Sequence, residues 1–322
     1  MKKLRFWLTG LLFIQLLLAV ALLWSNQWEA KQNQPKPLLN IDWQAIDKIA
    51  IRDKKTGFSA VKSGETWLLS DIEILADKES LGELLRNLQR LQTSWPVATS
   101  PNSHKRFEVA EDKFVRRIQL YSGNDLVGEL FLGSAPGLRQ SHARITGSDS
   151  IYTVELDTLN ILPSRNQWID KALIAAKNII SIQGPDYNLK KTGLSWSFNR
   201  SGPSIFLGNT DLGKINQDKV DELAGALSNL RIQRVANTAA EINSALTDKV
   251  TLIVSDGENR WIYELLEYGA NHFMRRSDID VLFSVERDVY EEISNVRQAD
   301  LILAKPDTSG KPAAGATEAT KS

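Results

Sequence analysis

The chain has 322 residues with 39 basic and 39 acidic side chains, so its formal net charge is zero. This balance removes the electrostatic argument for nucleic-acid binding, which needs a basic surface to displace counterions from phosphates. The sequence contains no cysteine, which excludes disulfides, thiolate metal sites and cysteine nucleophiles.

The N-terminal segment predicts a membrane anchor. The run Phe6–Trp24 is almost wholly apolar, and a transmembrane helix needs about 20 such residues. Basic side chains lie just before this run, within residues 1–5, and no comparable cluster follows it closely. The positive-inside rule then places residues 1–5 in the cytoplasm and the bulk of the chain in the periplasm. We therefore expect a single-pass protein of the bacterial inner membrane that contacts the lipid bilayer through residues 6–24.

A cleaved signal peptide is the alternative interpretation of the same segment. The sequence "AVA" at Ala19–Ala21 resembles a small-x-small cleavage site. Against cleavage, the apolar run continues past this point through Leu22, Leu23 and Trp24. Both interpretations export the same folded region.

Polar segments flank the region that we expect to fold. Residues 25–40 are mostly polar and contain Pro35 and Pro37, which is typical of a short extended linker. Residues 305–322 are rich in Pro, Gly, Ala, Ser and Thr and have almost no large apolar side chain. Such a tail cannot bury enough surface to offset its ordering entropy, so we predict that it is disordered.

Two amphipathic helices suggest an internal duplication. Leucines from Leu81 to Leu91 recur at helical spacing, and so do apolar residues from Val220 to Leu230. Each stripe follows directly on a residue that favours a helix N-cap, Asp77 in the first case and Asn216 in the second.

The neighbouring blocks match in the same order. Each helix follows strand patterns in which a turn glycine, Gly64 or Gly193, precedes a tryptophan by three residues. After each helix come two strand pairs with hairpin turns and then a short helix. Further matches pair His142 with His272 and Tyr152 with Phe283. Short hairpin connections require antiparallel strands.

The predicted fold class is therefore α+β, with one N-terminal transmembrane helix followed by two repeated, mainly antiparallel sheet domains. Each domain carries a packed amphipathic helix, and the length suits two domains of about 100–200 residues. The predicted boundaries are residues 41–174 for the first repeat and 175–304 for the second.

This arrangement resembles the domain-of-unknown-function 4340 family of bacterial envelope proteins. The resemblance covers roughly Ile41–Leu303 and is carried by structural positions in the two copies: Trp67, Leu84, Leu88, Gly133 and Tyr152, then Trp196, Leu223, Leu227, Gly269 and Phe283. It implies a periplasmic accessory module beside an ABC permease, as in gliding-motility-type transport systems. It implies no catalytic residue and no cofactor.

Local motifs for catalysis or metal binding are missing from the sequence. The three histidines have no zinc-type spacing, the scattered carboxylates form no recognisable pair, and Trp67 and Trp196 are expected in the core.

The loop and strand Gly133–Ile145 could hold a ligand. Its arginines Arg139 and Arg144, with Arg275 and Arg276 in the second copy, could hold an anion or an acidic lipid headgroup. The candidate ligand or partner contacts are Arg139, His142, Arg144, His272, Arg275 and Arg276.

Three functions follow from these observations. The first is a non-enzymatic, membrane-anchored interaction module, accessory to an envelope or ABC-type transport complex, whose partner is a membrane protein such as an ABC permease. The second is a periplasmic protein that binds lipid, glycan or peptide. The third, an envelope hydrolase, would need a cleft with convergent polar groups.

Overall fold

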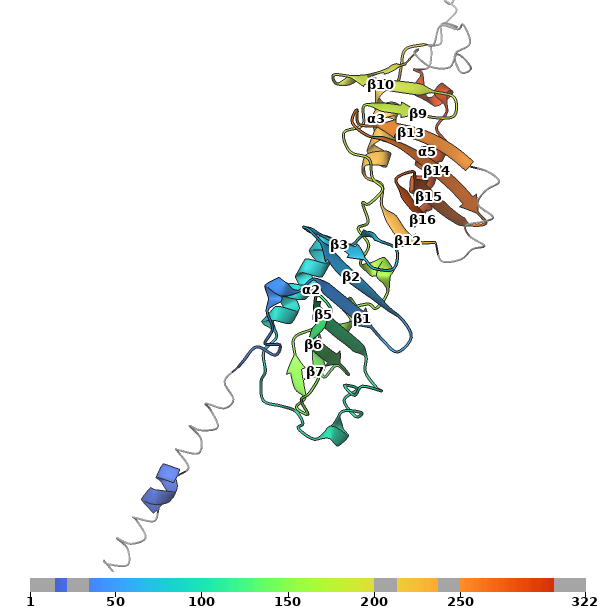
Figure 1. Ribbon diagram of the computed structural model, residues 1–322. Helices are drawn as coiled ribbons and strands as arrows, with labels where there is room; N and C mark the ends of the chain where they lie inside the picture. The colour runs from blue at the N-terminus through green and yellow to red at the C-terminus, as the bar shows by residue number, and fades with distance from the viewer. Residues whose placement is uncertain (1–14, 22–34, 200–212, 237–248, 304–322) are drawn as a thin grey trace, which may run out of the picture. The chain divides into compact units, whose positions relative to one another are not determined.

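The structure is a computed structural model that describes residues 15–21, 35–199, 213–236 and 249–303 (Figure 1). The chain divides into two compact units, Met1–Asp170 (unit 1) and Lys171–Ser322 (unit 2). In its described residues, each unit contains one eight-stranded antiparallel sheet and few helices. The fold is therefore α+β with sheet predominating.

In unit 1 the sheet has the order β4-β3-β2-β1-β5-β6-β7-β8. Its strands are β1 (Lys48–Arg52), β2 (Gly57–Ser63), β3 (Thr66–Leu69), β4 (Ile74–Leu75), β5 (Arg116–Ser122), β6 (Asp125–Leu132), β7 (Ser141–Ile145) and β8 (Tyr152–Val154). The helical elements are α2 (Lys78–Arg90) and the 3-10 turns η1 (Trp43–Ala45), η2 (Pro101–Ser103), η3 (Thr158–Asn160) and η4 (Arg165–Gln167).

In unit 2 the order is β11-β10-β9-β13-β14-β15-β16-β12. Its strands are β9 (Ser181–Gln183), β10 (Asn188–Thr192), β11 (Ser195–Phe198), β12 (Ile232–Val235), β13 (Lys249–Ser255), β14 (Arg260–Tyr268), β15 (Asn271–Arg276) and β16 (Ile279–Val285). The helical elements are α3 (Gln217–Ser228), α5 (Arg287–Ser294) and η5 (Gln298–Leu301).

The two sheets share most of their strand order. Without β4 and β12, the remaining strands run β3-β2-β1-β5-β6-β7-β8 in unit 1 and β11-β10-β9-β13-β14-β15-β16 in unit 2. The residues just before α2 and α3 also make corresponding contacts. Ala76 forms an isolated bridge with Ile169, and Ile215 forms one with Ile302. Seven strands of each unit thus follow one another in the same order, while strands β4 and β12 have no strand as a counterpart in the other unit.

Helices α2 and α3 begin where the sequence predicts. The Asp77 carboxylate accepts hydrogen bonds from the backbone N–H groups of Glu79 and Ser80, at 3.0 and 3.1 Å. The Asn216 side chain accepts one from Lys219 N. Both N-cap predictions are confirmed, and the predicted apolar stripes are buried at Leu81, Leu84, Leu88, Val220, Leu223 and Leu227.

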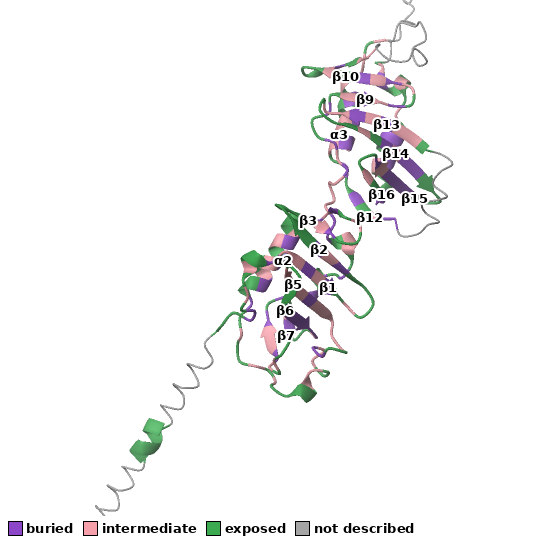
Figure 2. Cartoon of the chain, viewed as in Figure 1, coloured by how far each residue is buried: buried purple, intermediate pink, exposed green. Residues whose placement is uncertain are grey.

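The hairpin and core predictions also hold. Gly64 and Gly193 have φ of +59° and +62°, which favours glycine in these turns. Trp67 and Trp196 are 7% and 2% exposed, so both are core residues as predicted. Figure 2 shows buried residues along the central strands. Ile49 of β1 is fully buried.

The predicted match between the two histidines is wrong. Strand register followed outward from the Gly64 and Gly193 hairpins places Tyr152 and Phe283 at the same position, as predicted. However, His142 lies opposite Thr153, whereas His272 lies opposite Val285, the counterpart of Val154. The two histidines are therefore one residue out of step, and a shift of one residue turns a side chain to the other face of the sheet.

The predicted match of Gly133 with Gly269 is also wrong, because strand register makes Leu266 the counterpart of Gly133. The two glycines have different structural roles. A Cβ on Gly133 would lie 1.9 Å from Phe107 O, so a neighbouring segment approaches too closely for any side chain. Gly269 has open space around it but a φ of +60°, so its turn geometry favours glycine.

The short helix predicted at the end of each repeat differs between the units. In unit 2 it is α5, whereas in unit 1 only the three-residue turn η3 forms. Pro163 follows closely in unit 1, and a proline disfavours helical backbone in the residue before it.

The linker prediction is wrong in its described part. Leu38 and Leu39 are buried, and Leu38 N donates a hydrogen bond to Leu91 O at the end of α2. These residues pack against unit 1 because their apolar side chains bury surface there. Residues 25–34 of the linker and the predicted tail 305–322 lie outside the described residues.

Residues 15–21 of the predicted membrane span form a helix whose residues are all exposed. The rest of the span, residues 6–14 and 22–24, lies outside the described residues. Among the helices that are described, none combines the length and apolar character needed to cross a bilayer.

Candidate functional site

A hollow of about 1020 Å³ lies beside α2 in unit 1, and we call it the α2 groove. Three stretches of chain form its walls: α2 itself, the β6–β7 loop, and the segment that follows β8. The lining residues are Ser80, Glu83, Leu84, Asn87, Leu138, Arg139, Gln140, Glu155, Leu156, Asp157, Leu159, Asn160, Ile161, Leu162, Gln167 and Trp168.

Local sequence shapes two of these walls. Gln140 N donates to Gly137 O, which closes a turn with Leu138 and Arg139 at its tip. The Asp157 carboxylate accepts a hydrogen bond from Leu159 N at 2.9 Å and starts η3. Because η3 has only three residues, it fills less of the space beside α2 than a longer helix would.

Exposed leucines line the α2 groove. Leu138 is 91% exposed, Leu159 is 77% exposed and Leu162 is 38% exposed. Single exposed leucines need no explanation, but several around one concavity are typical of a binding surface.

The α2 groove is acidic. Its charged lining residues are the carboxylates Glu83, Glu155 and Asp157 and the single guanidinium of Arg139. Three carboxylates and one guanidinium give these lining residues a formal net charge of −2. The surface thus combines exposed apolar side chains with a negative rim.

Unit 2 has a smaller hollow at the corresponding place, of about 390 Å³. The apolar stripes align α2 with α3. Ser80, Glu83 and Leu84 line the α2 groove, and their counterparts Lys219, Glu222 and Leu223 line the hollow in unit 2. The unit 2 hollow is bounded by α5, which packs on α3 and β15. Helix α5 therefore occupies space that η3 leaves open in unit 1.

Of the six candidate contacts predicted from sequence, only Arg139 lines the α2 groove. It has a φ of +55°, a conformation that costs a non-glycine residue free energy. His142 and Arg144 belong to β7 and face the segment that contains Phe107 and Val109.

His142 and Arg144 hold that segment on the sheet. The His142 ring packs edge-on against Phe107, and its Nδ1 lies 3.1 Å from Ser134 Oγ. Burial lowers the pKa of His142. Arg144 Nε donates to Val109 O at 2.8 Å. Both side chains therefore have structural contacts.

His272 and Arg276 are likewise engaged in unit 2. The His272 ring centroid lies 4.7 Å from that of Tyr290 in α5. Arg276 donates to both carboxylate oxygens of Asp278, at 2.6 and 2.9 Å, and to Ala175 O at 3.2 Å.

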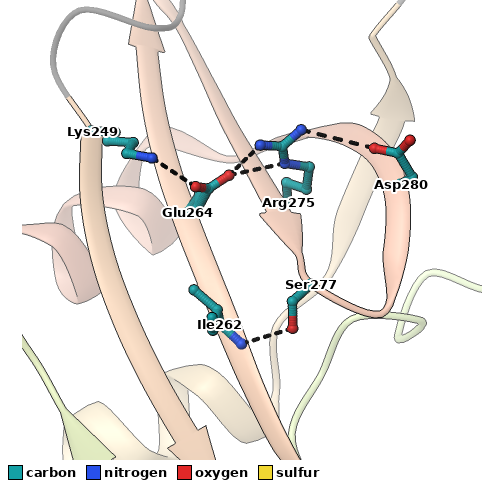
Figure 3. Close-up of polar contacts among 6 residues, drawn as sticks. All are labelled: Lys249, Ile262, Glu264, Arg275, Ser277 and Asp280. Carbon is teal, nitrogen blue, oxygen red and sulfur yellow. Dashed lines mark hydrogen bonds and ion pairs between the residues drawn. The ribbon is translucent and has the colours of Figure 1, made fainter.

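Arg275 belongs to a charged cluster across adjacent strands of unit 2, shown in Figure 3. Glu264 accepts hydrogen bonds from Lys249 Nζ at 2.8 Å and from Arg275 Nε at 2.9 Å. Arg275 Nη1 lies 3.8 Å from Asp280 Oδ1. The donors Lys249 and Arg275 hold the pKa of Glu264 below its ordinary value. These mutually paired charges are typical of a stabilising ion-pair network.

Within unit 1, Arg139 lines the α2 groove while His142 and Arg144 lie together against another segment. Within unit 2, Arg275 and Arg276 line one small hollow.

Sequence reasoning missed Leu138, Leu159 and Glu83 as members of one surface. A signal for two of them was present, because Leu138 and Leu159 are large apolar residues inside turn-forming sequence. Within the described parts of the chain, no group of three or more histidine, aspartate or glutamate side chains could hold a metal ion.

Comparison with known proteins gives one match. The model of a family described as "Domain of unknown function (DUF4340)" matches residues 67–249, which is more than half of the chain and includes parts of both units. Searches of curated proteins and of solved structures found no match.

Proposed function

The chain belongs to the DUF4340 family, and from this premise we propose that it is a membrane-anchored periplasmic interaction module. In this proposal it is accessory to an envelope or ABC-type transport complex and has no catalysis of its own. The observation that carries the proposal is the α2 groove, where exposed leucines and an acidic rim form one concave surface. Such surfaces suit recognition of a protein segment.

The N-terminal sequence supports the location. The apolar run of residues 6–24 behind a basic start would anchor the chain in the inner membrane with both units outside. We propose that the shared strand order reflects duplication of one domain. The partner in this setting is a membrane protein such as an ABC permease.

A pull-down from detergent-solubilised membranes tests the interaction role. The tagged full-length chain should retain a defined membrane partner, and Leu159→Asp should reduce its recovery at least several-fold. Leu194→Asp in unit 2 is the matched control, because Leu194 is also exposed, at 93%. A monodisperse monomer without any partner would contradict the proposal.

Binding of a lipid, glycan or peptide is the second candidate function. The volume of the α2 groove, about 1020 Å³, is at the upper end of the range for small-molecule pockets. Mass spectrometry of the purified protein distinguishes the two roles, because a ligand-binding protein should carry a stoichiometric small molecule. An envelope hydrolase is less favoured, since Asp157 of the groove already caps η3.

A further inference from the structure

We infer that the occupant of the α2 groove is a basic amphipathic helix of the partner protein. This inference rests on the interaction role proposed above and names the chemistry of the segment that binds. It follows from the internal comparison of the two units and from the charges around the groove.

Unit 2 provides a template for the shape of the occupant. Val154 in β8 and Val285 in β16 are equivalent by strand register. Counted from these two residues, Leu159 and Tyr290 each lie five positions further along the chain, Leu159 in η3 and Tyr290 in α5. Tyr290 is 6% exposed, whereas Leu159 is 77% exposed. A helix of eight residues, about 12 Å long, is therefore accommodated beside α3 by the chain itself. Beside α2 the chain forms only the three-residue turn η3, and Leu159 of this turn stays exposed.

The β6–β7 loop adds a second apolar contact that unit 2 lacks. Strands β6 and β7 are joined by residues 133–140, whereas β14 and β15 are joined by residues 269–270. The longer loop carries Leu138 to the edge of the groove, where it is 91% exposed. Leu138 and Leu159 thus offer contacts from two walls to the apolar face of one inserted helix.

The negative charges of the groove predict which residues form the polar face of the bound helix. Glu83 on α2 and Glu155 after β8 line the groove from two different stretches of chain, and both are exposed. Lysines or arginines on the flanks of an inserted helix would meet these carboxylates, and an acidic helix would be repelled. The same negative rim disfavours the phosphate of a lipid headgroup or a nucleic acid.

Site-specific photo-cross-linking tests this inference on the full-length chain in native membranes. A photoreactive benzoylphenylalanine replaces Leu159 or Leu138 in separate variants, and replaces Leu194 in the control. Because all three leucines are exposed, the folded state should tolerate the replacement, which far-UV circular dichroism can check. We expect the groove variants to cross-link to one partner segment with apolar residues at helical spacing and an excess of lysine and arginine.

A charge-reversed variant tests whether the bound helix is basic. With Glu83→Lys and Glu155→Lys together, the yield of the cross-link from Leu159 should fall about tenfold, since each reversed exposed pair is worth roughly 1 kcal/mol or less. Reversing two basic residues of the cross-linked segment to glutamate should restore the yield.

Four results would overturn the inference, and they differ in what they leave standing. Recovery of the partner with cross-links only from Leu194, or with an acidic cross-linked segment, refutes the basic helix but leaves the interaction role intact. Cross-links from the groove to this chain or to a second copy of it refute the partner helix in the same way. Absence of any recovered partner refutes both the inference and the proposed function.

Discussion

At the residue scale, both units place a carboxylate beside a cross-strand arginine on the corresponding sheet face. In unit 1, Glu129 accepts hydrogen bonds from Arg117 Nε at 2.6 Å and from Gln119 Nε2 at 2.8 Å. In unit 2, Glu264 is paired with Arg275 and Lys249. By register Glu264 corresponds to Phe131, two residues along from Glu129. The two pairs therefore lie on the same sheet face but at different positions and on different neighbouring strands.

Glu264→Gln should destabilise the protein in a pH-dependent way. Lys249 and Arg275 hold the pKa of Glu264 below its ordinary value of 4.5. A depressed pKa means that the carboxylate contributes stability above about pH 4.5, and that this contribution is lost as the pH falls through the lower folded-state pKa. At pH 7 the variant should lose about 1 kcal/mol in the free energy of unfolding, measured by urea denaturation.

Asp280→Asn is the control for this prediction. Its carboxylate is fully exposed and lies 3.8 Å from Arg275, so its removal should leave the urea midpoint unchanged. If the stability difference between wild type and Glu264→Gln persisted unchanged at pH 3, the assigned role of the Glu264 charge would be wrong.

Backbone strain at Arg139 gives a second residue-scale prediction. Its φ of +55° favours glycine, whereas alanine retains the clash of Cβ with the backbone. Both Arg139→Gly and Arg139→Ala remove the guanidinium. The glycine variant should be more stable than the alanine variant by about 1 kcal/mol, measured as the difference in urea unfolding. Equal stabilities would show that the turn relaxes around alanine.

At the element scale, helix capping explains where α2 begins. Asp77 satisfies two backbone donors of the first turn, and its own N–H donates to Trp168 O at 2.7 Å. The cap therefore joins the helix start to the end of the unit 1 chain. The same contact recurs in unit 2 between Asn216 N and Leu301 O, at 2.9 Å.

Asp77→Ala should cost about 1 kcal/mol in the free energy of unfolding, because the N–H groups of Glu79 and Ser80 lose their acceptor. Asp77→Asn keeps a side-chain acceptor, so the free energy of unfolding should fall by only a few tenths of the loss expected for alanine. Thermal unfolding followed at 222 nm compares the two variants. A loss that was equal for alanine and asparagine would rule out capping as the cause.

The contrast between η3 and α5 also belongs to the element scale. Two units with matching strand order differ in the length of one terminal helix and of one loop. In unit 1 both elements line the groove of about 1020 Å³, whereas in unit 2 the hollow of about 390 Å³ is lined by α5 and not by the short β14–β15 connection. Differences in connecting elements thus give two similar sheets surfaces of different size beside the helix.

At the scale of the whole molecule, the membrane anchor is the prediction with the widest consequences. Alkaline phosphatase, which is active only outside the cytoplasm, should be active when fused after Leu303. Deletion of residues 1–24 should abolish this activity, because the proposed export signal lies in that segment. A fusion to green fluorescent protein at the same place that fluoresced in the cytoplasm would contradict the topology. Intact-mass analysis distinguishes a retained anchor from cleavage near Ala21.

The parts of the fold that sequence predicts are those governed by local chemistry. Asp77 and Asn216 start helices, Gly64 and Gly193 close turns, and each acts through neighbours a few residues away. The spacing of apolar residues then predicts which side of each helix is buried. The pairing of His142 with His272 failed because register depends on every strand between the hairpin and the histidine.

By itself, the sequence determined the α+β class, the order of the repeated blocks, the capped helices and membership of the DUF4340 family. Only the tertiary structure decided that Arg139 joins Glu83 and Leu159 in one groove while the other candidate residues lie elsewhere. The physical reason is distance along the chain. A cap or turn is stabilised within a few residues, whereas a groove arises where segments far apart in sequence stop short of filling the space between them.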